Sequence, residues 1–337
     1  MATVGIVGAG GLVGSRVVEV FHEMNIDDLE LYLSGYEKSV GKSVMYKGEQ
    51  LVIEKCDIEA LLKLDIVVLC TPTEASRDLV HALMGGPVIV DTSSAFRMEE
   101  NVPLVVPEVN GDNIHQHKGL IAGPNCSTIQ LVMTLCPIHR EFGLSRVHVS
   151  TYQSVSGVGY RAIEELKESS LQKLTTGSIE FSKESPEFPH PIAFNLIPQI
   201  DSFTDNGYSK EEMKMVNETR KILNIPDLPI SCTCVRVPVF IGHSEACLVE
   251  TVKEPSVEKV TEILEEFPGV TIVDDLSHQL YPMPIDCENT DDVYVGRIRK
   301  DLSSKNGILF WQVADNLRRG AATNACNIVK LLLEDGR

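Results

Sequence analysis

Short apolar segments alternate with a helical pattern in the first part of the chain. Strand-like runs occur at Thr3 to Val7, Leu29 to Leu33, Leu64 to Cys70 and Val88 to Val90. After the first run, apolar residues recur at three- and four-residue spacing from Val17 to Met24, which predicts an amphipathic helix. Strands that are apolar on both faces and alternate with helices indicate a parallel sheet covered on both sides. We therefore predict a doubly wound α/β domain.

The second part of the chain has a different pattern. Strands rich in β-branched residues are predicted at Val147 to Gln153, Thr233 to Val239, Ala246 to Val252, Val270 to Val273 and Val293 to Ile298. Helical patterns lie among them at about Tyr160 to Leu174, Lys210 to Leu223 and Ser256 to Glu266. This mixture predicts an α+β domain with a mixed or antiparallel sheet. Residues 175–198 form a long connection, and 320–333 form a helix expected to pack on the first domain.

Composition narrows the functional class. The chain has 337 residues, of which 43% are apolar and 23% charged, which suits two ordinary globular domains. The net charge of −18 disfavours binding to nucleic acid or to an anionic membrane. No apolar run is long enough for a membrane span, no signal peptide is recognisable, and the nine cysteines are scattered. We therefore expect a soluble cytoplasmic protein with reduced thiols.

A glycine-rich turn follows the first strand. Gly8, Gly11 and Gly14 stand between that strand and the first helix, the context of a dinucleotide-binding turn. Glycine allows the tight turn and the approach of the backbone to a pyrophosphate, and the helix start offers free N–H groups. The alternative is a glycine turn without a ligand. We favour cofactor binding, in a Rossmann-type domain.

The end of the second strand bears on the choice of cofactor. This strand ends at Ser34 without the acidic residue that usually binds the ribose of NAD. Lys38, Ser39 and Lys42 follow and could hold a 2′-phosphate, although Glu37 lies among them. The sequence therefore favours NADP over NAD.

Cys126 is the candidate nucleophile. It follows Gly123, Pro124 and Asn125 and precedes an apolar helical pattern, so it should lie at a helix N-terminus. The helix dipole and free N–H groups there favour a reactive thiolate and could stabilise an oxyanion. A buried structural cysteine is the alternative, but the polar, turn-forming neighbours argue against it.

His243 and Arg236 are candidates for proton transfer and carboxylate binding. His243 follows Gly242 between two predicted strands, and histidine has a pKa suited to acid–base work. Arg236 can bind a carboxylate through two parallel hydrogen bonds, unless it only forms a surface ion pair. Cys232 and Cys234 near His243 could suggest zinc, but no fourth ligand has suitable spacing, so we expect no metal.

Taken together, these residues resemble the aspartate-semialdehyde dehydrogenase family over essentially the whole chain. The matching segments in order are Gly8 to Gly14, Asp91 to Arg97, Val106 to Asn110, Gly123 to Thr128, Gln153 to Gly157, Arg236 to Val239, Gly242 to Glu245, Val293 to Arg297 and Ala314 to Ala322. So many ordered matches are far more specific than any one of them. Three details depart from the family pattern: Gly10 replaces a common threonine, Lys38 replaces a frequent arginine, and the loop after the second strand is longer.

The resemblance implies a reaction. Cys126 would attack L-aspartyl 4-phosphate and release inorganic phosphate, and hydride transfer from NADPH to the thioester would lead to L-aspartate 4-semialdehyde, a step in lysine, threonine, methionine and isoleucine biosynthesis. His243 would carry the proton and Gln153 would orient the reacting carbonyl. The resemblance also implies substrate contacts: phosphate at Arg97, Asn125 and Lys214, the α-carboxylate at Arg236 and the ammonium group at Glu211.

The resemblance further implies cofactor contacts and an assembly. The candidate NADP-binding residues are Gly8, Gly10, Gly11, Leu12, Val13, Gly14, Ser34, Lys38, Ser39, Thr71, Pro72, Ser156, Gly157 and Asn316. Residues 1–126 with 316–337 would form the NADP-binding domain, and 127–315 the catalytic and dimerisation domain of a homodimer.

Three other functions compete. An N-acetyl-gamma-glutamyl-phosphate reductase has a similar architecture, but an acetylated amine carries no charge to pair with Glu211. A non-catalytic nucleotide-binding paralogue would not need Cys126, Gln153 and His243 together. A cysteine hydrolase would leave the glycine-rich turn without a purpose.

Overall fold

The chain forms two compact units in the computed structural model, which describes residues 2–179 and 186–335. The first unit comprises Met1–Ile129 with Gly320–Arg337, and the second comprises Gln130–Arg319. These divisions lie a few residues from the boundaries expected from the sequence, 126/127 and 315/316. Because helix α5 (Cys126–Phe142) begins in the first unit and continues into the second, it connects the two.

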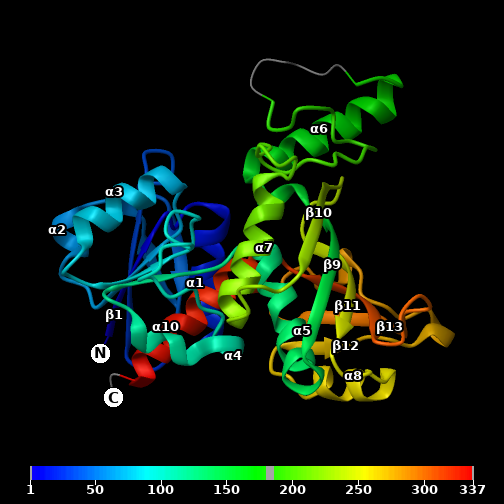
Figure 1. The fold of residues 1–337 in the computed structure, drawn as a ribbon. Helices are drawn as coiled ribbons and strands as arrows, with labels where there is room; N and C mark the ends of the chain where they lie inside the picture. The colour runs from blue at the N-terminus through cyan, green and yellow to red at the C-terminus, as the bar shows by residue number, and fades with distance from the viewer. Residues whose placement is uncertain (1, 180–185, 336–337) are drawn as a thin grey trace. The chain divides into compact units, whose positions relative to one another are not determined.

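A parallel sheet forms the centre of the first unit (Figure 1). Its strands, in spatial order, are β5 (Glu54–Lys55), β2 (Leu29–Gly35), β1 (Ala2–Val7), β6 (Ile66–Leu69), β7 (Val88–Asp91) and β8 (Leu120–Ala122). The helices of the unit are α1 (Leu12–Met24), α2 (Ile58–Leu61), α3 (Thr73–Leu83), α4 (Pro107–Asn110) and α10 (Thr323–Asp335), with a 3-10 turn at Gly111–Gln116. A hairpin of β3 (Ser43–Tyr46) and β4 (Glu49–Val52) lies outside this sheet.

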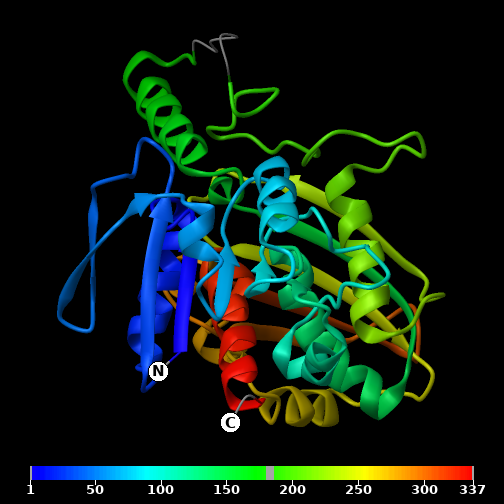
Figure 2. The same ribbon diagram turned by 90° about the vertical axis from the view of Figure 1, so that its left-hand side faces the viewer.

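Side chains of the parallel sheet enter two separate cores. Val4 and Ile6 of β1 pack with residues of α1 and α10, whereas Val7 packs with residues of α2 and α3. Successive side chains of a strand point to opposite faces, so one strand contributes to both cores. The predicted doubly wound α/β domain is confirmed. Figure 2 shows α10, in red, running alongside the blue and cyan elements of this unit, and α10 contacts α1 as expected.

A six-stranded mixed sheet forms the centre of the second unit. Its spatial order is β10 (Ile230–Arg236), β9 (Leu144–Gln153), β11 (His243–Thr251), β14 (Gly307–Ala314), β13 (Val293–Lys300) and β12 (Val270–Ile272). The two outer pairs are parallel and the three inner pairs antiparallel. The accompanying helices are α6 (Tyr160–Thr176), α7 (Lys210–Leu223), α8 (Val257–Glu265) and α9 (Pro284–Cys287), with 3-10 turns at Val155–Gly157 and Leu276–His278. The predicted α+β domain with a mixed sheet is confirmed.

Several predicted boundaries were wrong. The strand expected at Thr233 to Val239 spans Ile230–Arg236, because it pairs in parallel with β9 and because Pro238 has no N–H for a sheet. The strand expected to begin at Ala246 begins at His243. Strands β14, β8 and the β3–β4 hairpin were not predicted. Of the expected connection at 175–198, residues 175–176 still belong to α6, and 180–185 lie outside the described residues.

The C-terminal helix also begins later than expected. A π-helical turn occupies Arg318–Ala322, and α10 follows it. Single π-turns are uncommon and occur often near functional sites. Within the described part of the chain, no helix could cross a membrane, and no group of three or more His, Cys, Asp or Glu could hold a metal ion. All nine cysteines fall in that part and none forms a disulfide.

Candidate active site

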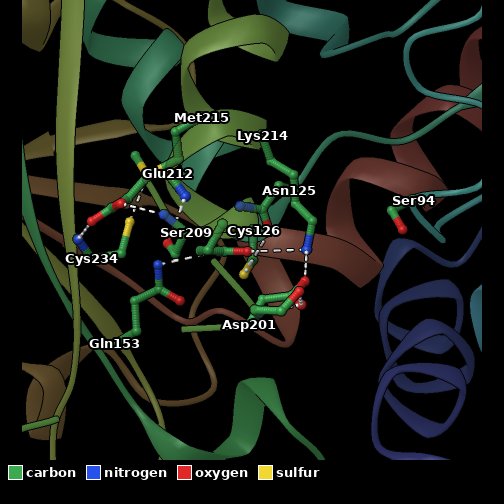
Figure 3. Close-up of polar contacts among 12 residues, drawn as sticks. Ser94, Asn125, Cys126, Gln153, Asp201, Ser209, Glu212, Lys214, Met215 and Cys234 are labelled. Atoms are coloured by element: carbon green, nitrogen blue, oxygen red, sulfur yellow. Dashed lines mark hydrogen bonds and ion pairs between the residues drawn. The ribbon is translucent and has the colours of Figure 1, made fainter. Parts of the chain in front are cut away.

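The first unit contains the candidate nucleophile. Cys126 is the first residue of α5, which has 17 residues, and its side chain is half-buried. Its Sγ donates a hydrogen bond to Oδ1 of the buried Asn125 at 3.5 Å. The two residues are labelled in Figure 3. A thiol at the start of a long helix has the N–H groups and the dipole that stabilise a thiolate. The position of Cys126 agrees with the sequence prediction.

Gly320, within the π-helical turn, lies directly against the nucleophile. A Cβ at this glycine would be 2.8 Å from Cβ of Cys126 and 3.2 Å from its Cα. A separation of this size is shorter than real Cβ contacts, so only glycine fits without movement. The π-turn therefore brings a backbone segment against Cys126, a role for Gly320 that the sequence did not reveal.

A buried arginine belongs to the same unit. Nε of Arg97 donates to the carbonyl oxygen of Gly123, and Nη2 donates to that of Thr92, both at 2.9 Å. These bonds hold the guanidinium beside the loop that leads through Asn125 to Cys126. Two of the three residues assigned to phosphate, Arg97 and Asn125, thus belong to this loop region, whereas Lys214 belongs to the second unit.

The glycine-rich turn borders a cavity of about 640 Å³ in the first unit. The cavity is lined by Gly8, Gly10, Gly11, Tyr36, Glu37, Lys38, Ser39, Lys42, Cys70, Thr71 and Pro72. Both groups that the sequence suggested, the glycines and the residues around Lys38, therefore border one cavity. Tyr36 and Cys70 were not predicted. Leu12, Val13, Gly14 and Ser34 do not line it, and Ser156, Gly157 and Asn316 belong to the second unit.

Three glycines of the turn have a structural reason. Gly8 has φ of +88°, and a Cβ there would lie 2.4 Å from the carbonyl oxygen of Cys70. A Cβ on Gly14 would lie 2.2 Å from the carbonyl oxygen of Gly8, so this glycine allows α1 to pack closely on β1. A Cβ on Gly10 would lie 2.3 Å from Cβ of Ser39. These glycines therefore permit the close packing of the turn that a dinucleotide-binding fold uses.

Three other candidate active-site residues lie at one end of the sheet of the second unit. Gln153 and Arg236 end the parallel strands β9 and β10 and are paired in register. His243 begins β11, which runs antiparallel to β9 with Ser244 opposite Tyr152. The ends of three neighbouring strands therefore present an amide, a guanidinium and an imidazole together. All three side chains are buried.

A chain of polar contacts extends from Gln153 to α7. The amide nitrogen of Gln153 donates to Glu211 at 3.2 Å and to Thr151 at 3.2 Å. Glu211 is buried and also accepts from Nζ of Lys214 at 3.3 Å, and Lys214 in turn contacts Asp201 at 3.0 Å (Figure 3). Lys214 and the backbone N–H of Ser202 lower the pKa of Asp201, although burial opposes them. Asp201 was not predicted from the sequence, which offers no motif for it.

The start of α7 is fixed by its own side chains. Ser209 and Glu212 form a reciprocal capping box, and Glu212 also accepts from the backbone N–H of Cys234 in β10 at 3.0 Å (Figure 3). This arrangement ties the helix that carries Glu211 and Lys214 to the strand that ends at Arg236.

His243 lies in a buried polar network. Its Nδ1 is 3.1 Å from both the backbone nitrogen and Oγ of Ser154. Oδ1 of Asn316 accepts from Oγ of Ser154 at 3.1 Å and from the backbone N–H of Gly242 at 2.9 Å, and Asn316 also bonds to Ser156. The sequence analysis assigned Asn316 and Ser156 to NADP binding. In the structure, their side chains form a hydrogen bond with each other in this network.

Burial and charge keep His243 neutral. Burial and the nearby guanidinium of Arg236 lower the pKa of His243 to about 3, although the Gly242 backbone partly offsets them. Gly157 lies close to both side chains, since a Cβ there would be 3.1 Å from Nη1 of Arg236 and 3.4 Å from Nε2 of His243. Glycine at this position leaves open the space in front of the two functional groups.

Both units match models of known protein families. A family model described as "Semialdehyde dehydrogenase, NAD binding domain" matches residues 3–117, and one described as "Semialdehyde dehydrogenase, dimerisation domain" matches residues 135–319. Aspartate-semialdehyde dehydrogenase of Bacillus subtilis is 45% identical over 334 residues, covering 98% of this chain and 96% of the relative. That of Aquifex aeolicus is 47% identical over 339 residues, covering 99% and 98%.

The fold agrees with the sequence comparison. A crystal structure of aspartate semialdehyde dehydrogenase II from Vibrio cholerae in complex with ASA is similar with a TM-score of 0.92 and 41% identity, covering 99% of both chains. The family predicted from the sequence motifs is confirmed over the whole chain. The chain therefore belongs to the aspartate-semialdehyde dehydrogenase family.

Proposed function

We propose that this chain reduces L-aspartyl 4-phosphate to L-aspartate 4-semialdehyde through a thioester on Cys126. The thiolate adds to the acyl carbon, the carbon–oxygen bond to phosphate breaks, and inorganic phosphate leaves with the electron pair. NADPH, when bound, would supply the hydride that reduces the thioester carbon; the carbon–sulfur bond then breaks and Cys126 returns as the thiolate. The observation that carries this assignment is the position of Cys126 at the first residue of α5.

Arg97, Asn125 and Lys214 would bind the phosphate. A dianionic group needs local cations in a chain of net charge −18, and the buried Arg97 already has its guanidinium fixed by two carbonyl oxygens. Lys214 is held by Asp201 and Glu211, so phosphate binding would compete with these carboxylates for its ammonium group.

Arg236, Glu211 and Gln153 would bind the amino-acid part of the substrate. Arg236 can pair with the α-carboxylate, and Glu211 with the ammonium group. Because Glu211 accepts from the amide of Gln153, one network connects recognition of the ammonium group to the residue assigned to the reacting carbonyl. An N-acetylated substrate would offer no ammonium group to Glu211, which disfavours the sister reductase reaction.

The residues of the glycine-rich cavity fit NADP. The exposed turn at Gly8, Gly10 and Gly11 would receive the pyrophosphate at the start of α1, and Lys38, Ser39 and Lys42 would meet the 2′-phosphate. Thr71 and Pro72 line the same cavity. We propose that 1–126 with 316–337 act as the NADP-binding domain and 127–315 as the catalytic and dimerisation domain.

We further propose a cytoplasmic homodimer. One face of the mixed sheet keeps partly exposed side chains, including Tyr152, Leu248 and Trp311, on three adjacent strands. The rings of Tyr152 and Trp311 lie 5.5 Å apart. An aromatic and aliphatic sheet face in a domain whose family model is named for dimerisation supports a second copy as its partner. The nine unlinked cysteines suit a reducing compartment.

The test is reduction of NADP⁺, followed by absorbance, with L-aspartate 4-semialdehyde and inorganic phosphate. Turnover should require phosphate and fail with N-acetyl-L-glutamate 5-semialdehyde. Cys126→Ala should abolish turnover and leave NADPH binding unchanged, with Cys136→Ala in the same helix as the matched control. Phosphate-dependent turnover in Cys126→Ala would remove this residue from the mechanism.

A further inference from the structure

Asp201 is held in one orientation by the loop that leads to α7. Its φ of +67° lies in the left-handed region, which aspartate and asparagine adopt more readily than most residues. Oδ1 of Asp201 accepts from the backbone N–H of Ser202 at 2.7 Å, and its carbonyl oxygen accepts from Nε2 of Gln199 at 3.2 Å. The carbonyl oxygen of Ser202 in turn accepts from the backbone N–H of Lys210, the first residue of α7. The carboxylate is therefore fixed relative to α7.

The ammonium group of Lys214 lies between two carboxylates. Its Nζ is 3.0 Å from Oδ2 of Asp201 (Figure 3) and 3.3 Å from Oε2 of Glu211. The other oxygen of Glu211 accepts from the amide of Gln153. The side chain of Glu211 is 7% exposed, whereas that of Asp201 is 38% exposed. Lys214 thus connects a buried carboxylate to a solvent-accessible one.

The charges of these three side chains do not cancel. Burial raises the pKa of Asp201, but the backbone N–H of Ser202 and the charges of Lys214 and Lys210 outweigh it, so that the pKa lies below its usual value. Asp201 is therefore ionised at neutral pH. Because two carboxylates share the one ammonium group of Lys214, the cluster of Asp201, Glu211 and Lys214 carries one negative charge in excess. A cationic group of a bound molecule would balance that charge.

Loss of the Asp201 charge would remove this excess. Lys214 and Glu211 would then form a neutral pair, and an arriving ammonium group would have to compete with Lys214 for the buried carboxylate. With Asp201 ionised, Lys214 can turn toward Asp201, and Glu211 becomes available to the arriving group. The competition matters most at Glu211, because charge pairs are stronger where water is excluded.

We propose that Asp201 is a positioning residue for recognition of the substrate ammonium group: it takes Lys214 from Glu211 when the substrate arrives, so that Glu211 can pair with that group. This inference rests on the proposed function, in which Glu211 binds the ammonium group. The side chains on which it depends all belong to the second unit.

Asp201→Asn tests this role with little change of shape. Asparagine adopts the same φ, and its Oδ1 can still accept from Ser202, so the variant loses the charge and keeps the loop. At saturating phosphate, KM for L-aspartate 4-semialdehyde should rise about tenfold and kcat should change less than about twofold, as expected when only binding is weakened. Asp201→Glu keeps the charge and should raise KM less than Asp201→Asn does. Asp205→Asn, at an exposed position of the same loop, is the control and should leave KM unchanged.

A second substitution separates positioning from a general structural role. Lys214→Met removes the side chain that Asp201 holds, so Asp201→Asn should have no further effect on KM for the semialdehyde in that background. The inference would be overturned by the same increase of KM in the Lys214→Met background, by an unchanged KM in Asp201→Asn alone, or by a loss of kcat without a change of KM. Absence of phosphate-dependent turnover in the wild type would instead refute the proposed function.

Discussion

Glu245 gives the second unit a pH-dependent stability that one substitution should remove. This residue lies in β11 and its side chain is fully buried. Burial raises its pKa from 4.5 to about 8, and the charge of Glu211 adds to this, whereas the amide groups of Gln130 and Gln312 lower it. Nε2 of Gln312 donates to Glu245 at 2.6 Å. The folded protein therefore holds this carboxyl group protonated at neutral pH.

The sign and size of the effect follow from linkage. Because the folded state binds the proton more tightly than the unfolded state, the stabilisation is complete below pH 4.5 and is lost as the pH rises to about 8. Each pH unit in that interval costs about 1.4 kcal/mol, so the free energy of unfolding falls by roughly 5 kcal/mol across it. Between about pH 6 and about pH 9, the Glu245 contribution falls by roughly 3 kcal/mol.

Glu245→Gln replaces the protonated acid by a neutral group of similar shape that can still accept from Gln312. We expect the free energy of unfolding of the variant, relative to that of wild type, to rise by roughly 3 kcal/mol between about pH 6 and about pH 9. Urea denaturation followed by the fluorescence of Trp311, the one tryptophan of the chain, reports on this sheet because Trp311 precedes Gln312 in β14. Glu250→Gln, at a partly exposed position of the same strand, is the control. An identical pH dependence in wild type and Glu245→Gln would refute the reasoning.

Three further substitutions test the candidate site. Gly320→Ala should lower kcat about 100-fold, because the added Cβ would displace Cys126. NADPH binding should be unchanged. An unchanged rate in single-turnover kinetics would contradict this prediction. Lys38→Ala should raise the Kd of NADPH about tenfold and leave that of NADH unchanged in a fluorescence titration, and equal effects on both would exclude a 2′-phosphate contact. Glu211→Gln should raise KM for the semialdehyde about tenfold or more while changing KM for phosphate less, and the reverse order would reassign Glu211.

The local sequence was sufficient to predict the features that depend only on residues close together in the chain. The glycine-rich turn followed from φ and steric requirements that only glycine meets, and Gly8 and Gly14 show both. The position of Cys126 followed from turn-forming residues before an apolar helical pattern. The parallel sheet followed from strands that are apolar on both faces. These features depend on neighbours within a few residues, so the chain order alone reveals them.

Tertiary structure decided the features that depend on strand register. Gln153, Arg236 and His243 meet because β9, β10 and β11 end in register, and register is set by hydrogen bonds between segments distant in sequence. Strand β14, which was not predicted, brings Gln312 to Glu245 and carries the chain on to Asn316 beside His243. The raised pKa of Glu245 results from burial, and its hydrogen-bond partner Gln312 lies on another strand. No local pattern contains that information, because the same residues in another register would face solvent.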